Sequence, residues 1–176
     1  MSYHIYSSEG VILKATGVGE ADKIYSIFTS VFGKIGIKAQ GVRYLKSKLR
    51  YGLSGLSLVN VAFVGTLNGF WRLVDVEEIL VFKNIKKSRL KTRSALKIFS
   101  LVDRLVQGEE ADPDLFDKLK VFLFFLENND LSQEKLKDLG ISTAVQIVEH
   151  LGYADKETKD QNPVLVIKNA LEQSML

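Results

Sequence analysis

The chain has 176 residues, of which 46% are hydrophobic and 26% charged, and it contains no cysteine. This composition is typical of a globular protein, and the lack of cysteine excludes a disulfide framework, a thiolate nucleophile and a thiolate-bound zinc ion. No apolar run approaches the ~18 residues that span a bilayer, and the first residues do not have the order of a secretory signal. We therefore expect a cytoplasmic protein without membrane contact.

Charge is distributed unevenly along the chain. Residues 1–98 carry sixteen Lys or Arg and six acidic residues, a net charge of +10, whereas the remaining residues carry eight and fifteen, a net charge of −7. Such asymmetry is typical of a nucleic-acid-binding portion joined to a portion with another task.

The first 82 residues alternate between apolar and polar side chains and contain several glycine-rich turns, which is the pattern of short β-strands. Asn68-Gly69, between the last two apolar runs, is a strong hairpin signal. The glycines stand where a small barrel needs bends, so the pattern predicts a five-stranded β-barrel of the OB type. The predicted strands are Glu9–Lys14, Lys23–Ser30, Ile35–Gln40, Leu56–Val64 and Phe70–Phe82.

The third predicted strand continues into a basic loop that contains no acidic residue. Clustered positive charge repels itself in a compact fold, so we interpret this segment as a surface that meets a polyanion. OB barrels commonly bind oligonucleotides on strands two and three and on neighbouring loops, with basic side chains on phosphates and aromatic rings against bases. The expected nucleic-acid-binding residues are Lys34, Lys38, Arg43, Lys46, Lys48, Arg50, Tyr25 and Tyr44, with Tyr51 as a further candidate for stacking.

After Phe82 the apolar spacing changes to a helical period, so the predicted fold class is α+β: an OB domain at residues 1–82 and a small all-α domain at residues 83–176. Ser88 and Asp112 are expected helix N-caps, and Pro113 suits a first helical position. The predicted helices are residues 89–107, residues 113–128, Ser132–Leu139, Ser142–Leu151 and a terminal helix within Val164–Leu176.

A basic cluster opens the first long helix, although cations there oppose the helix dipole. The second helix carries an aromatic stripe whose ordinary role is core packing, while an open part of it would form a groove for an apolar segment. The two features together suit a partner peptide with acidic and apolar residues. The expected partner-binding residues are Arg89, Arg93, Lys97, Phe122 and Phe125.

No residue pattern indicates catalysis. His4 and His150 lie far apart without a supporting pattern, and the acidic residues around Asp112 do not have the spacing of a calcium loop. The Gly17–Gly19 turn lacks the remaining residues of a phosphate-binding fingerprint. We therefore expect a binding protein and not an enzyme, with no catalytic residue, no cofactor and no metal site.

Several short motifs in the first half of the chain resemble, in order and spacing, the amino-terminal pattern of the bacterial RecO family. They are Glu9–Lys14, Gly19–Ile24, Phe28-Thr29, Gly33-Lys34, Gly41–Arg43 and Lys46–Leu49. Asp114–Phe116 and Leu151–Ala154 resemble the family's helical region more loosely. Val18 stands where the family often has tyrosine.

The resemblance implies a recombination mediator in DNA repair that binds single- and double-stranded DNA through an OB domain and anneals complementary strands. It also implies contact with RecR and with the C-terminal tail of single-strand-binding protein, and through them help in loading RecA. Many members carry a four-cysteine zinc module after the helix that matches Gly152-Tyr153. Here Asp155–Asn162 stand in that place without cysteine, so the resemblance is to a form that lacks the module.

Two other functions fit the same residues. One is an RNA-binding OB protein, and the other is a protein-interaction scaffold whose basic face only provides solubility. A salt-dependent titration with single-stranded DNA, RNA and a neutral control separates the three.

Overall fold

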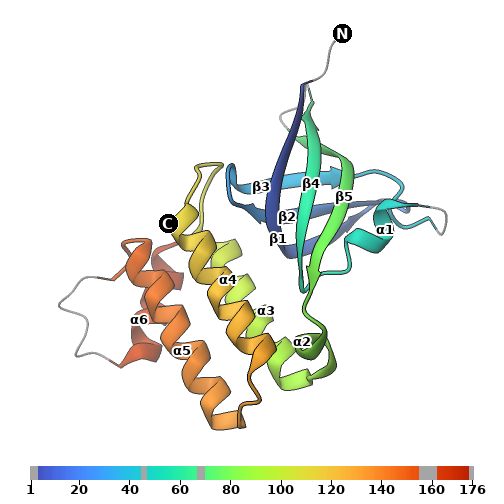
Figure 1. The fold of residues 1–176 in the computed structure, drawn as a ribbon. Coiled ribbons are helices and arrows are strands. Elements are labelled where there is room, and N and C mark those ends of the chain that lie inside the picture. Colours follow the sequence, from blue (N-terminus) through green and yellow to red (C-terminus); the bar gives the residue numbers. More distant parts are fainter. Residues whose placement is uncertain (1–3, 45–46, 67–69, 155–161, 175–176) are drawn as a thin grey trace. The chain divides into compact units, whose positions relative to one another are not determined.

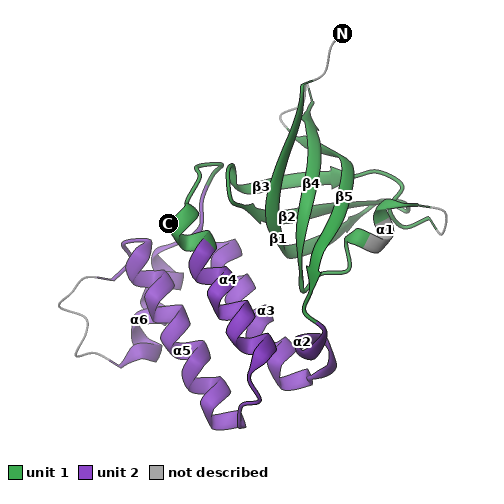
Figure 2. Cartoon of the chain, viewed as in Figure 1, with its two compact units in different colours: residues 1–82, 108–116 green, residues 83–107, 117–176 purple. Residues whose placement is uncertain are grey.

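A computed structural model describes residues 4–44, 47–66, 70–154 and 162–174 of the chain, without the side chains of Arg50 and Tyr51 (Figure 1). Contacts divide the chain into a barrel unit, Met1–Phe82 with Gly108–Phe116, and a helical unit, Lys83–Gln107 with Asp117–Leu176 (Figure 2). Five strands precede the long helices, which confirms the predicted α+β class. None of the helices in the described ranges has the length and apolar character needed to cross a membrane.

The barrel unit is built on five strands that close in the order β1-β2-β3-β5-β4. β1 pairs with both β2 and β4 and so closes the ring, and the only parallel pair is β3 with β5, among the described residues. The prediction of an OB-type barrel is confirmed, and β1 is longer than predicted at both ends. The strands are β1 Ile5–Val18, β2 Asp22–Thr29, β3 Gly33–Ala39, β4 Ser57–Gly65 and β5 Trp71–Val81.

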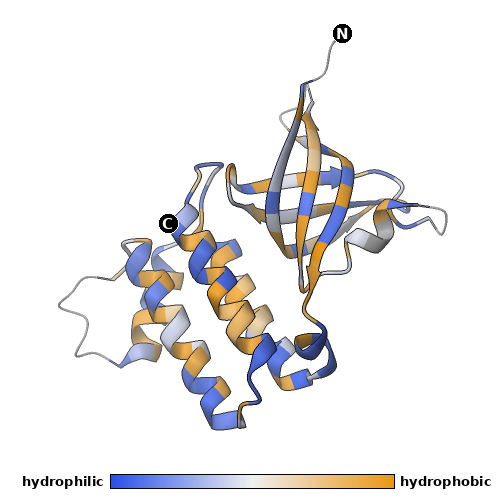
Figure 3. Ribbon diagram, viewed as in Figure 1, coloured by the Kyte–Doolittle hydropathy of each residue, from blue (hydrophilic) through white to orange (hydrophobic). Residues whose placement is uncertain are grey.

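Apolar side chains at alternate strand positions fill the barrel, and Figure 3 shows the alternation of hydrophobic and hydrophilic residues along the strands. Branched residues such as Ile27 on β2, Ile37 on β3 and Val61 on β4 are fully buried there. Four rings, those of Tyr6, Phe32, Phe63 and Trp71, also pack together, with centroids 5.1–6.0 Å apart. These rings and branched side chains fix which face of each strand is turned outward.

Two of the helices after the strands, α3 and α4, are capped at their N-termini as the sequence predicts. The Ser88 hydroxyl accepts a hydrogen bond from the backbone N–H of Lys91, and the Asp112 carboxylate accepts one from that of Leu115 at 2.9 Å. α3 packs against α5 and α6. The helices are α2 Lys83–Lys87, α3 Arg89–Leu105, α4 Pro113–Asn128, α5 Gln133–His150 and α6 Pro163–Gln173.

The prediction of two short helices at Ser132–Leu139 and Ser142–Leu151 is wrong, because α5 runs through Gly140 without a break. Glycine inside a helix costs about 1 kcal/mol relative to alanine, which is less than the burial of several apolar side chains returns. Leu136 before Gly140 and Ala144 and Ile147 after it are buried, so one continuous stripe is formed. Packing of this stripe outweighs the local preference of glycine.

The connection between α3 and α4 returns to the barrel unit and lies on the β2–β3 turn. Gly33 in that turn has φ +63°, and a Cβ added to it would overlap the backbone carbonyl of Glu110. Further along, the ring of Phe116 packs on Phe28, with centroids 6.0 Å apart, and both side chains are almost fully buried. We call residues 108–116 the strap, because this segment is fastened to the barrel at two points.

The close approach at Gly33 predicts that Gly33→Ala destabilises the fold. The new methyl group would meet the strap backbone, and alanine would be strained at φ +63°, so we expect a loss of about 2 kcal/mol or more in the free energy of unfolding. Urea unfolding of the full chain measures it. Gly36→Ala on β3 is the matched control, because its added Cβ meets nothing within 4 Å. Equal effects of the two substitutions would contradict the prediction.

Candidate nucleic-acid interface

The basic loop after β3 is anchored in the barrel by its apolar residues. Val42 and Leu53 are 3% and 8% exposed and belong to the barrel core, and Leu49, in the short helix α1 Leu49–Gly52, packs against it. The backbone N–H of Arg43 donates a hydrogen bond to the carbonyl of Ala21 at 3.0 Å. Both ends of the loop are held in this way, and its described charged side chains, those of Arg43 and Lys48, are exposed to solvent.

Asp22, at the start of β2, joins this loop to the strands. Its carboxylate accepts hydrogen bonds from the backbone N–H of Gly41 at 2.9 Å and forms an ion pair with the Lys38 ammonium at 3.0 Å. The Gly41 hydrogen bond, and after it the contact with Lys38, holds the pKa of the Asp22 carboxyl below its usual value. Lys38 is therefore oriented by an acid and remains partly exposed at the surface.

Beside Lys38 the outer surface of the barrel has a hollow of about 310 Å³. Phe70, which is 56% exposed, contributes an aromatic ring, and the exposed Arg72 on β5 lies opposite Lys38 in the parallel pairing of β3 and β5. The hollow therefore combines apolar and aromatic surface with two cations, as a site for a stacked base and its phosphate requires. We call it the barrel hollow; its lining residues are Val18, Ile24, Lys38, Gln40, Thr66, Phe70, Trp71 and Arg72.

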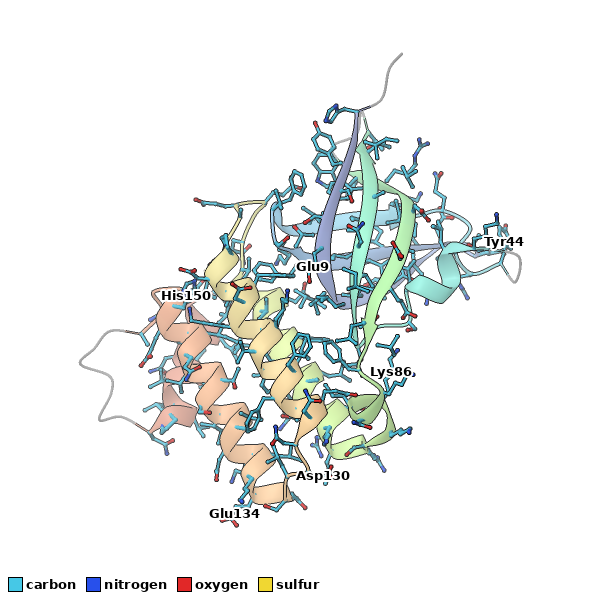
Figure 4. All side chains as sticks on the ribbon, in the orientation of Figure 1. Glu9, Tyr44, Lys86, Asp130, Glu134 and His150 are labelled. Atoms are coloured by element: carbon cyan, nitrogen blue, oxygen red, sulfur yellow. The ribbon has the colours of Figure 1, made fainter. Side chains whose placement is uncertain are left out.

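The two tyrosines predicted to stack on bases differ in how far they are exposed. Tyr25 is 2% exposed, because it points to the same side of β2 as Ile27 and fills the core, so a stacking role for Tyr25 is not supported. Its burial raises the pKa of the phenol. Tyr44 is 64% exposed and stands at the edge of the barrel unit in Figure 4.

Only some of the predicted basic residues lie near the barrel hollow or on the exposed loop. Lys38 borders the barrel hollow, and Arg43 and Lys48 are exposed on the loop. The Arg43 guanidinium also donates a hydrogen bond to the carbonyl of Gly19 at 3.0 Å. Lys34 is half-buried on β3. Lys46 and the side chain of Arg50 lie outside the described residues.

Sequence reasoning missed Phe70, Trp71 and Arg72 as site residues. A signal for them exists: they directly follow the predicted hairpin turn, and Leu73 is the first residue of that run that fills the core. Period-two alternation then turns Arg72 outward. Phe70, which directly precedes β5, is 56% exposed, so part of its ring is accessible to a ligand.

A second candidate site lies in the helical unit, between α3, α5 and α6. It is a groove of about 910 Å³, which we call the helical groove, and Arg93 and Lys97 of α3 line it as exposed cations. Arg104 also lines it and donates a hydrogen bond to the carbonyl of Leu171 on α6 at 3.1 Å. Its apolar lining residues are Leu90, Ile98, Leu101, Leu136, Ile141, Ala144, Val164, Ile167 and Leu171.

The expected combination of these cations with the aromatic stripe of α4 is wrong. Phe122 is 3% exposed because it lies on the inner side of α4, so its ring is not open to a partner. Phe125 is 45% exposed, but it lies beside Val121 and Phe124 on a surface of α4 that is separate from the helical groove. Arg89 is exposed and does not line the helical groove. The apolar lining beside Arg93 and Lys97 comes from α3, α5 and α6 instead.

The two histidines belong to separate units of the chain. The His4 ring packs edge-on against Tyr6 in the barrel unit, and His150 lies 3.2 Å from the Lys118 ammonium in the helical unit. Within the described part of the chain, no three His, Cys, Asp or Glu side chains are grouped so that they could hold a metal ion.

The lowered pKa of Asp22 predicts an acid-sensitive contribution to stability. Because the folded-state pKa is depressed, this contribution is complete above the usual aspartate pKa of about 3.9 and is lost as the pH falls through the folded-state value. The stability difference between the natural chain and Asp22→Asn should therefore shrink on acidification. Urea unfolding across this pH range measures it. Glu20→Gln, at an exposed carboxylate of the same turn, is the control, and a pH-independent difference for Asp22→Asn would contradict the prediction.

Comparison with known proteins relates the barrel to one family. Residues 1–77 match the family described as Recombination protein O N terminal. The chain is 30% identical over 118 residues to DNA repair protein RecO of Bacillus cytotoxicus, covering 67% of this chain and 47% of that protein. Over 109 residues it is 30% identical to DNA repair protein RecO of Listeria monocytogenes serotype 4a, covering 62% and 42%.

A relative from Cyanothece sp., also named DNA repair protein RecO, is 29% identical over 124 residues, covering 70% of this chain and 42% of that protein. The alignments thus span less than half of the length of these curated relatives. The family match at residues 1–77 includes the basic loop and all lining residues of the barrel hollow, and it agrees with the closed OB-type barrel. The amino-terminal region of the chain, residues 1–77, thus matches the amino-terminal domain of the RecO family.

Proposed function

We propose that the chain binds DNA through its barrel unit and acts as a recombination mediator in DNA repair. The observation that carries the proposal is the barrel hollow, where the exposed ring of Phe70 lies among residues that include Lys38 and Arg72. The exposed Arg43 and Lys48 of the loop add further positive charge to the same unit. Cations neutralise phosphates and aromatic rings stack on bases of any identity, so the binding is expected to be independent of sequence.

The two parts of this surface suit different forms of DNA. Phosphates are accessible in single strands and in duplexes, so the basic loop serves both. A base that enters the barrel hollow must be unpaired and unstacked from its neighbours. We therefore propose binding to both forms, with the barrel hollow giving the preference for single strands.

The match of residues 1–77 to the RecO family supports the rest of the proposal. We propose that the chain promotes annealing of complementary strands, contacts RecR and helps to load RecA. Its role is binding rather than catalysis. These are activities of whole proteins of which the chain aligns with less than half, so each of them is a proposal for this chain.

For the helical unit, we propose that the helical groove receives the C-terminal tail of single-strand-binding protein. The resemblance to the RecO family implies that this tail is acidic and apolar. The helical groove offers the complementary surface, with Arg93 and Lys97 beside a floor of leucine, isoleucine and valine side chains.

The DNA-binding proposal is tested by the salt dependence of binding to single-stranded DNA. If about four phosphate contacts are made, log affinity should fall with log salt at a slope of roughly −3, and Arg43→Gln with Lys48→Gln should reduce the slope by about 1.4. Phe70→Ala should weaken binding by about fivefold or more without changing the slope, because stacking releases no counterions. Fluorescence anisotropy of a labelled oligothymidylate measures both.

Lys135→Gln, an exposed charge on α5 outside the helical groove, is the control for these variants. A slope that the double substitution leaves unchanged would remove the loop from the site. Tighter binding of an RNA strand of the same length would favour the RNA-binding alternative. Binding of neither nucleic acid at low salt would favour the scaffold.

The tail proposal predicts that reversing charge in the helical groove abolishes peptide binding. Arg93→Glu with Lys97→Glu should weaken binding of the tail peptide by more than about tenfold, since two opposite charges become like charges. Isothermal titration of the full chain measures this, with Lys135→Glu as the control. Phe125→Ala tests the other apolar surface, on α4. Loss of binding in Phe125→Ala alone would place the tail on α4 and contradict the proposal.

A further inference from the structure

One contact connects the strap to the lining of the barrel hollow. The indole N–H of Trp71 donates a hydrogen bond to the Glu109 carboxylate, with 2.8 Å between Nε1 and Oε1. Trp71 is the first residue of β5 and lines the barrel hollow beside Phe70 and Lys38. Glu109 is far from it in sequence and follows Gly108, which has φ +79° and turns the chain after α3.

The position of Glu109 does not depend on this hydrogen bond. The next residue, Glu110, lies with its backbone against Gly33, and the ring of Phe116 is buried against Phe28. Asp112 also fixes the backbone of the strap by accepting from the N–H of Leu115. The strap that carries the Glu109 carboxylate is thus held on the barrel by other contacts, at Gly33 and Phe28.

For Trp71, the hydrogen bond adds a directional contact to those that the surrounding rings make with the indole. Tyr6 and Phe63 meet the indole at interplanar angles of 76°, with centroids 5.3 and 5.1 Å away. Such edge-to-face contacts position the ring but are individually weak. A carboxylate on the indole N–H is a charge-assisted hydrogen bond, which is stronger and directional.

We propose that Glu109 is a positioning residue that holds Trp71 as a fixed wall of the barrel hollow and so determines its preference for unpaired bases. The inference rests on the proposed DNA binding. It adds that the strap, and not only the barrel, contributes to the recognition of single strands.

Comparing the binding of single-stranded and duplex DNA tests the positioning role of Glu109. The bases of a duplex are stacked and paired, so the duplex is bound by the basic loop and gains little from an ordered Trp71 ring. Glu109→Ala should therefore weaken binding of a single-stranded oligothymidylate about threefold to fivefold, and should change binding of a duplex of equal length less than twofold. Glu109→Gln should retain most of the affinity for the single strand, because its amide oxygen still accepts from the indole.

The experiment uses the full chain, with labelled oligonucleotides followed by fluorescence anisotropy. Glu110→Gln, at the neighbouring exposed carboxylate, is the matched control. Trp71 is the sole tryptophan of the sequence, so its emission reports the environment of the ring directly. In Glu109→Ala the emission of the free protein should shift, and it should not shift in Glu110→Gln.

A double-mutant cycle isolates the contact. Trp71→Phe removes the N–H, so Glu109→Ala should have no further effect on single-strand affinity when it is added to Trp71→Phe. Equal affinity of Glu109→Ala and the natural chain for single strands would overturn the inference, as would equal losses for single strands and duplexes. A natural chain that binds neither DNA would instead overturn the proposed function itself.

Discussion

The arrangement of the barrel unit depends on the burial of branched and aromatic side chains inside a closed ring of five strands. Since side chains alternate along a strand, filling the interior determines which residues are left for the surface. Tyr25 is drawn inward with Ile27, while Arg72 is turned outward next to the buried Leu73. Core packing therefore decides which residues reach the candidate interface, and the ion pair with Asp22 further orients Lys38 there.

The same principle explains the basic loop. Positively charged side chains do not themselves fix the conformation of a loop. Here Val42 and Leu53 enter the barrel core and fix the loop at both ends. Asp22 adds a polar connection from β2 to Gly41 and Lys38. In the helical unit the equivalent role belongs to the stripe of α5, which forms the floor of the helical groove.

The sequence predicted the features that depend on short-range patterns of residues. The five strands, the caps at Ser88 and Asp112 and the OB-type closure could be read from alternation, glycine turns and capping residues. The continuous α5 could not, because the packing that outweighs Gly140 comes from other helices. The barrel hollow could be predicted only in part. Lys38 stands on a strand whose period of two is visible in the sequence, but Trp71 and Arg72 are brought beside β3 by the β3–β5 pairing, which sequence spacing does not reveal.

The strap has a consequence for how the chain is divided. A cut after Phe82, which the change in sequence pattern suggests, would leave the barrel without residues 108–116. The fragment would then expose the aromatic surface of Phe28 to water and lose the backbone that rests on Gly33. The polypeptide enters the helical unit, returns to the barrel unit and leaves it again. The two units are therefore interleaved in sequence, and neither corresponds to a single continuous stretch of the chain.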